Sequence, residues 1–244
     1  MRLNKFLSET GQYSRRGADA LIAEGRVTRN GVRAELGTQV AIGDEIRVDG
    51  TIVGKAADRP PPVYIAFNKP VGVTCTTERH IGGNIIDFIN HPERIFPIGR
   101  LDKDSEGLIL LTNDGDIVNE VLRVEHGHEK EYVVAVDQLV TAEALTRMSR
   151  GVRIEDGMTR PCRITKVGPR VFRIVLTQGL NRQVRKMCAA CGYKVVTLTR
   201  VRIMHIGLGA LKYGSWRNLT PAEVRGLRVR EPAAPATRAE PRRR

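Results

Sequence analysis

The pattern of apolar and polar positions divides the chain into a small N-terminal module and a larger module that follows it. Within residues 1–50, apolar positions at helical spacing predict two short helices, the first ending at Gly11 and the second beginning at Ser14. The Asn-Gly pair at 30–31 predicts a hairpin over 27–33, because this pair supplies the two positive φ angles of a type I′ turn. Two helices followed by a hairpin indicate a compact α+β module.

The larger module mixes alternating apolar positions, which predict strands, with helical spacing. The predicted strands cover residues 63–67, 72–76, 109–112, 131–136 and 171–176. A turn at 68–70 joins the first two of them. The predicted helices cover residues 84–90, 117–123, 141–149 and 181–190, with a capping box at Thr220 starting a last one. Because strands and helices do not alternate regularly, an α+β fold with a mixed, largely antiparallel sheet flanked by helices is expected.

Composition predicts where the two modules meet and where the second one ends. Residues 51–62 include three consecutive prolines, which favour an extended conformation, so this run is predicted to be a linker. Residues 228–244 are rich in Pro, Ala and Arg, carry a net charge of +4 and lack core-forming side chains, which is typical of a disordered basic tail. The expected organisation is a first module at 1–50, the linker, a second module at 63–227 and the tail.

The charge of the chain adds a functional prediction. Its 40 Lys and Arg residues exceed its 27 Asp and Glu residues, a formal net charge of +13. Residues 160–217 contain 13 of the basic residues and no acid. Unpaired cations in that number are expected to face a polyanion, and nucleic acid is the favoured one. In the first module the predicted RNA contacts are Arg2, Lys5, Arg15, Arg16 and Arg26.

Other classes of protein are disfavoured by what the sequence contains. No apolar run approaches the roughly 18 residues that cross a bilayer, so no membrane protein is expected. The N-terminal residues lead into charge rather than into an apolar signal segment, which predicts a cytoplasmic protein with four reduced Cys thiols. A monomer is the default expectation.

Three acids lie in a polar loop before the predicted strand at 109–112, namely Asp102, Asp104 and Glu106. Acids in such a loop are often solvated turn formers. They could also hold a divalent ion, but two cations interleave with them, and the chain's Cys and His residues show no ligand spacing. No metal site is therefore expected.

The same loop resembles a known signature. Gly99-Arg100-Leu101-Asp102-Lys103-Asp104-Ser105-Glu106-Gly107-Leu108 is similar to the GRLD motif of the RsuA-type pseudouridine synthases, which isomerise uridine in ribosomal RNA. Lys130-Glu131-Tyr132 resembles the second motif of the family, and residues 178–187 resemble the third. The N-terminal module resembles the S4 RNA-binding domain. The resemblance spans residues 1–227 with the motifs in the family's order, and the runs 96–107 and 128–132 most resemble the branch associated with a 23S rRNA hairpin.

The resemblance implies roles for three side chains. It implies that Asp102 is the nucleophile, that Arg185 is its counterion, and that Tyr132 stacks on the target uracil. The Tyr132 hydroxyl is then a candidate for moving the C5 proton. The chemistry is reasonable, because a carboxylate can trap an electrophilic carbon of a base or a sugar without any cofactor. Whether Asp102 attacks C6 of uracil or C1′ of ribose stays open.

Four more residues are assigned to RNA contact, each beside a plainer alternative. Lys130 shares a strand face with Tyr132 and could orient the substrate, contact phosphate or be solvated. Arg100 could contact RNA or fill the gap left by a flipped base. Asn181 and Arg182 start a predicted helix, whose N-terminus could hold a phosphate or be an ordinary capped surface.

The resulting hypothesis is a cofactor-independent pseudouridine synthase acting on ribosomal RNA, with 23S rRNA the favoured substrate and transfer RNA left open. The main alternative is a catalytically silent RNA-binding or ribosome assembly protein, which would not need Asp102, Tyr132 and Arg185 together. A third hypothesis is a metal-dependent RNA hydrolase. Its ligands would be Asp102, Asp104, Asp114 and Asp116.

Overall fold

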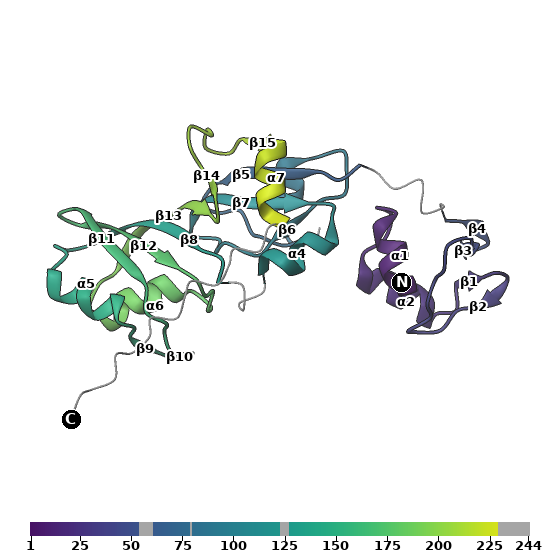
Figure 1. Ribbon diagram of the computed structural model, residues 1–244, viewed down its shortest axis with the longest axis horizontal. Helices are drawn as coiled ribbons and strands as arrows, with labels where there is room; N and C mark the ends of the chain where they lie inside the picture. The colour runs from purple at the N-terminus through teal and green to yellow at the C-terminus, as the bar shows by residue number, and fades with distance from the viewer. Residues whose placement is uncertain (54–60, 79, 123–126, 229–244) are drawn as a thin grey trace, which may run out of the picture.

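The computed structural model describes residues 1–53, 61–78, 80–122 and 127–228. These residues form a small N-terminal unit and a larger unit built on one extended β-sheet, and Figure 1 shows the two at different ends of the molecule. Most of the predicted linker (54–60) and nearly all of the predicted tail (229–244) lie outside the described residues.

The N-terminal unit packs two helices on a four-stranded sheet. The helices are α1 (Leu3–Glu9) and α2 (Arg15–Ala23). The strands are β1 (Val27–Arg29), β2 (Val32–Arg33), β3 (Ile46–Val48) and β4 (Thr51–Ile52), in the order β2-β1-β3-β4. The predicted cap and hairpin are confirmed: the Ser14 hydroxyl accepts from the Gly17 amide, and Asn30 and Gly31 have φ angles of 50° and 80°.

The first unit extends past its predicted boundary at residue 50. Thr51 and Ile52 pair with β3, and the Val53 amide donates to the Ile46 carbonyl at 2.9 Å. The Val53 side chain is buried in the core of the unit. The predicted linker start at 51 is therefore three residues early, because a short edge strand and one core residue follow the last turn.

The larger unit contains a sheet of nine strands. They are β5 (Tyr64–Lys69), β6 (Phe96–Ile98), β7 (Glu106–Thr112), β8 (Lys130–Val136), β11 (Arg163–Gly168), β12 (Val171–Leu176), β13 (Val195–Ile203), β14 (Ile206–Gly207) and β15 (Trp216–Asn218). The main path runs β11-β12-β8-β13-β7-β5-β15, with β14 paired to β13 and β6 to β7. Two further strands, β9 (Arg153–Ile154) and β10 (Gly157–Met158), form a separate hairpin. The predicted α+β fold is confirmed.

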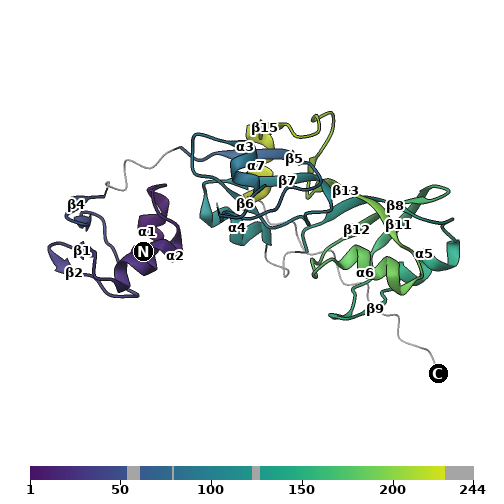
Figure 2. The ribbon, with the colours of Figure 1, turned by 180° about the vertical axis from the view of Figure 1, so that it is seen from behind.

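Helices cover the two halves of this sheet differently (Figure 2). On the β5–β7 half, α4 (Gly115–Leu122) and α7 (Pro221–Arg228) pack on one face, and α3 (Ile85–Ile89) packs on the other. On the β8–β12 half, α5 (Ala142–Ser149) and α6 (Gln183–Ala190) pack on the face that carries Val134, Phe172 and Ile174. Among the described residues, no helix is both long and apolar enough to cross a membrane.

The two halves meet where β7 and β13 run parallel, the one parallel pair among the described strands. In this pair Gly107 lies opposite Arg200. A Cβ atom at Gly107 would stand 2.3 Å from the Arg200 carbonyl oxygen, and its φ of 101° is one that side chains rarely adopt. A glycine is therefore required for the close approach that joins the halves.

The structure corrects two predictions near the start of this unit. Residues 72–76 do not form a strand, and Thr74 makes only an isolated bridge to Asn84. Residues 68 and 69, predicted to turn, are instead the end of β5, with Lys69 fully buried. A lysine followed by a proline is typical of a turn. Here, backbone carbonyls accept hydrogen bonds from the Lys69 ammonium, and this allows the side chain to be buried.

Candidate active site

A pocket of about 280 Å³ lies at the junction of the two sheet halves. The loop 99–102, the pocket-facing side chains of β8 and β13, and the segment 177–183 form its walls. Among the described residues that line the pocket, Asp102 is the one carboxylate. The Lys and Arg residues of the lining are Arg100, Lys130, Arg182 and Arg200.

Asp102 is held at the pocket by its neighbours in the loop. Leu101 is buried in the core and anchors the loop, and the Ser105 amide donates to the Asp102 carbonyl at 3.1 Å. The Asp102 side chain is 31% exposed, and Arg182 Nη1 lies 4.0 Å from its Oδ2. The carboxylate is thus fixed at its backbone, accessible at its oxygens and only loosely paired.

Arg185 does not form the predicted pair with Asp102. Its Nη2 donates to the Asp104 carbonyl at 2.6 Å and to the Ser105 hydroxyl at 3.2 Å, and its Nε lies 3.7 Å from the Asp104 carboxylate. The cation beside Asp102 is Arg182, one helical turn earlier. The predicted partner of Asp102 was wrong because Arg182 and Arg185 both contact the loop that carries Asp102. Only the conformation of the turn that enters α6 decides which of the two arginines reaches the Asp102 carboxylate.

Arg182 links that turn to the loop. It caps α6 in the left-handed conformation, with φ of 51°, and this moves the helix start from the predicted 181 to 183. Its guanidinium makes two hydrogen bonds to the Asp104 carboxylate, at 2.9 and 2.8 Å. These bonds hold the pKa of Asp104 at about 2, far below its ordinary value. Asp104 thereby ties the loop to the turn that enters α6.

Tyr132 and Lys130 face the pocket from β8. Both line the pocket, as expected for residues two positions apart in one strand. Tyr132 is half-buried and packs against core residues from both sheet halves. Burial, and secondly the charge of Arg200, lower the pKa of the Lys130 ammonium.

The sequence analysis missed two buried cations behind the loop. Arg200 is 3% exposed, and it donates from Nε to the Leu108 carbonyl at 2.6 Å and from Nη1 to the Arg100 carbonyl at 3.2 Å. Lys69 donates to the carbonyls of Pro70, Val73 and Lys103, and burial lowers its pKa. The available signal in both cases was a basic residue beside a run of apolar or β-branched residues, 64–67 before Lys69 and 195–199 before Arg200.

The predicted RNA contacts separate into free and paired cations. At the pocket, Arg100 and Asn181 are exposed on the lining, and Arg182 is exposed as well but is bound to Asp104. In the N-terminal unit, Arg2, Arg15 and Arg16 are exposed. By contrast, Lys5 pairs with Asp116 at 2.5 Å and with Glu9 at 3.6 Å, and Arg26 pairs with Asp49 and Glu24.

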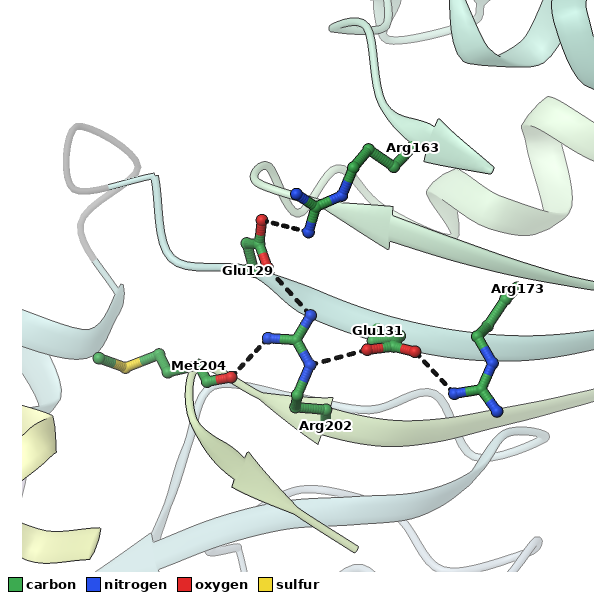
Figure 3. Close-up of polar contacts among 6 residues, drawn as sticks. All are labelled: Glu129, Glu131, Arg163, Arg173, Arg202 and Met204. Carbon is green, nitrogen blue, oxygen red and sulfur yellow. Dashed lines mark hydrogen bonds and ion pairs between the residues drawn. The ribbon is translucent and has the colours of Figure 1, made fainter. Parts of the chain in front are cut away.

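The basic block at 160–217 is also less free than predicted. Figure 3 shows Arg202 between two carboxylates, with further arginines on their other sides, in the order Arg163–Glu129–Arg202–Glu131–Arg173. Arg217 pairs with Glu223, and Lys186 with Glu155 and Asp156. The expectation that the block's cations lack partners was wrong for these residues, because their acids come from outside the block.

No three His, Cys, Asp or Glu side chains gather as metal ligands in the described part of the chain. The acids named for the hydrolase hypothesis have separate partners instead. Asp104 pairs with Arg182, Asp114 accepts from the Tyr64 hydroxyl, and Asp116 pairs with Lys5.

Comparison with known proteins gives a consistent family. A profile described as "RNA pseudouridylate synthase" matches residues 63–190, and one described as "S4 domain" matches residues 1–46. A solved structure described as "Crystal structure of pseudouridylate synthase" is similar with a TM-score of 0.68 and 29% identity, covering 93% of this chain and 99% of that one.

Curated relatives agree. A protein of Salmonella typhi named "Dual-specificity RNA pseudouridine synthase RluF" is 51% identical over 223 residues, 91% of this chain and 77% of that protein. A protein of Escherichia coli strain K12 with the same name is 51% identical over 92% of this chain and 77% of its own length. In Bacillus subtilis, "Ribosomal large subunit pseudouridine synthase B" is 39% identical, with 93% of this chain and 96% of that protein covered.

Proposed function

The chain belongs to the RNA pseudouridylate synthase family, and from this membership we propose that it isomerises a uridine of 23S ribosomal RNA, with Asp102 as the nucleophile. The B. subtilis relative is named for the large ribosomal subunit, which supports this substrate. The RluF relatives are named for dual specificity, so a second RNA class belongs among the substrates to be tested. A ribosomal RNA substrate supports a cytoplasmic location.

The pocket accommodates this reaction as follows. The target uridine leaves its stack, and its base lies against Tyr132. A carboxylate oxygen of Asp102 forms a bond to carbon, the C1′–N1 bond breaks, and the uracil rotates so that C5 joins C1′. The C5 proton passes to the Tyr132 hydroxyl as that hydroxyl gives its own proton to solvent, N1 takes a proton from solvent, and the bond to Asp102 breaks to release the carboxylate. Substrate and product are isomers, so the sequence of steps is redox-neutral.

The surrounding cations serve to hold the RNA. Arg100, Asn181 and Arg182 lie at the pocket, where they can contact the backbone on either side of the flipped nucleotide. Arg2, Arg15 and Arg16 of the N-terminal unit are exposed and supply phosphate contacts away from the pocket.

One observation carries the proposal: Asp102 is the single carboxylate among the described residues that line the pocket, and Tyr132 lies in the same lining. The test uses 23S rRNA fragments labelled with tritium at uridine C5, incubated with the protein in EDTA. Tritium release without strand scission is expected. No release from any fragment would favour the RNA-binding alternative, and cutting that EDTA suppresses would favour the hydrolase.

A single substitution then tests the nucleophile. Asp102→Asn keeps the shape of the side chain and removes its charge, so turnover should fall below detection while RNA affinity changes little. Tritium release and filter binding on the same RNA measure the two effects. Normal turnover by Asp102→Asn would show that another group attacks. Asp114→Asn, which changes a carboxylate outside the pocket lining, is the matched control.

A further inference from the structure

The pocket holds more positive charge than its single carboxylate requires. Arg182 is bound to Asp104, and Arg100 is exposed. This leaves Lys130 and Arg200 in the lining. Among the described residues, no carboxylate forms an ion pair with either of them.

One nitrogen of the Arg200 guanidinium makes no hydrogen bond to the described residues. Its Nε and Nη1 are fixed on the Leu108 and Arg100 carbonyls, whereas its Nη2 is buried and has no hydrogen-bond partner among the described residues. An unpaired buried donor costs free energy, so native proteins rarely keep one without a use. Two fixed nitrogens also leave the third little freedom to move.

The sheet register places Arg200 beneath the expected position of the substrate. Arg200 lies opposite Tyr132 in the β8–β13 pair, and Ile203 lies opposite Lys130. A register shift between Arg200 and Arg202 allows Arg200 and Ile203 to line the pocket while Arg202 joins the ion pairs of Figure 3. A base stacked on Tyr132 therefore has Arg200 beside it on the neighbouring strand and Lys130 two residues along the same strand.

The reaction creates a negative charge at that position. If Asp102 attacks C6, its oxygen forms the new bond and the electron pair of the C5–C6 double bond moves onto O4. If Asp102 attacks C1′, the C1′–N1 bond breaks and its electron pair spreads from N1 over O2 and O4. In both routes the carboxylate becomes a neutral adduct and the uracil ring gains one negative charge.

We propose, on the basis of the function proposed above, that Lys130 and Arg200 form a cationic floor that stabilises the anionic uracil ring of the intermediate. Fixed donors aimed where charge develops lower a barrier without a cost of reorganisation. Because the ring is neutral in the bound substrate, the cationic floor acts on the rate of the bond exchange and contributes little to RNA affinity.

The first measurement compares three variants with the wild type by the rate of pseudouridine formation in single turnover at saturating RNA. Lys130→Met keeps length without charge and is expected to lower the rate by about 10²–10³-fold, with RNA affinity nearly unchanged. Lys130→Arg restores the charge and should recover at least a tenth of the wild-type rate. Lys103→Met, the control, removes an exposed lysine beside Asp102 but outside the lining and should react at nearly the wild-type rate.

The second measurement places 5-fluorouridine at the target position and follows consumption of that nucleotide. Fluorine withdraws electrons and stabilises a ring anion by itself, so the defect of Lys130→Met should shrink at least tenfold. Arg200→Lys should show the same pattern. If Arg200→Lys does not fold, the Lys130 variants are sufficient.

Three results would overturn the inference: an equal defect of Lys130→Met on both nucleotides, a defect confined to RNA affinity, or no defect. Failure of the proposed function is distinguishable, because the wild-type protein would then form no pseudouridine on any RNA tested.

Discussion

At the scale of single residues, two buried cations support the loop that carries Asp102. Lys69 holds three carbonyls, including that of Lys103, and Arg200 holds the carbonyl of Arg100. Asp102 lies between residues 100 and 103. Two side chains from different strands therefore fix the backbone on both sides of the proposed nucleophile.

Lys69→Met should destabilise the protein by about 2 kcal/mol, because it leaves buried carbonyls without a donor while filling a similar volume. Urea unfolding measures the change in the free energy of unfolding. Turnover should also fall, since the loop loses one of its supports. Lys103→Met, which changes an exposed lysine of the loop itself, should unfold like the wild type. Equal stability of the two variants would contradict the role of Lys69.

At the scale of elements, local signals predicted the helices well but only some of the strands, because β6, β11, β13 and β15 had no predicted counterpart. Caps at Ser14, Thr141 and Thr220 are present, because a cap depends on residues three positions apart. The β7–β13 junction gave no such signal, because it joins segments more than 80 residues apart. The one local sign of this junction is Gly107. Its lack of a side chain allows the close approach of Arg200, which the residues next to Gly107 in the sequence do not indicate.

Gly107→Ala should destabilise the protein strongly, by about 3 kcal/mol or more, because its Cβ would clash with the Arg200 backbone in a conformation that alanine avoids. Gly115→Ala is the matched control. Gly115 begins α4 and has open space around it, so that change should be neutral or stabilising. Thermal unfolding of both variants measures the difference. A Gly107→Ala protein as stable as Gly115→Ala would disprove the close approach.

The start of α7 predicts a pH dependence. Glu223 accepts from the Thr220 amide and pairs with Arg217 through both oxygens, and chiefly Arg217 lowers its pKa from 4.5 to about 2. A folded pKa below the unfolded one stabilises the protein above about pH 4.5, and the contribution is lost as the pH falls toward 2.

Glu223→Gln keeps the cap and removes the charge, so it should cost about 1 kcal/mol at pH 7, a value discounted for partial exposure of the pair. The difference in melting temperature from the wild type should narrow steadily from pH 5 to pH 2.5. If the difference in melting temperature between Glu223→Gln and the wild type stayed constant over this pH range, its cause would be packing and not the charge of Glu223.

At the scale of the whole molecule, the net charge of +13 does not say where the unpaired cations lie. Many cations of the basic block at 160–217 pair with acids from outside the block. The row of ion pairs from Arg163 to Arg173 in Figure 3 connects four strands on the face of the sheet away from the pocket. The exposed arginines of the N-terminal unit are therefore a larger share of the free positive charge than the sequence indicates.

RNA binding should show this distinction through its salt dependence. Arg15→Gln together with Arg16→Gln should weaken binding and reduce the slope of log K against log salt by about 1 to 2. Arg26→Gln removes the same kind of side chain, but one already paired with Asp49 and Glu24, so its slope should change less. Filter binding from 50 to 300 mM salt measures both. Equal slopes for the Arg15→Gln/Arg16→Gln variant and for Arg26→Gln would contradict the distinction between free and paired arginines.

The sequence by itself determined what depends on neighbours along the chain: the helices and their caps, the hairpin at 27–33, the α+β class and the motifs around Asp102 and Tyr132. Only the tertiary structure decided which arginine stands by Asp102, that Lys69 and Arg200 lie behind it, and which cations are neutralised. Periodicity and capping act within a few residues, whereas ion pairing and burial depend on segments such as 102–105 and 182–200, which approach each other only when the sheet closes.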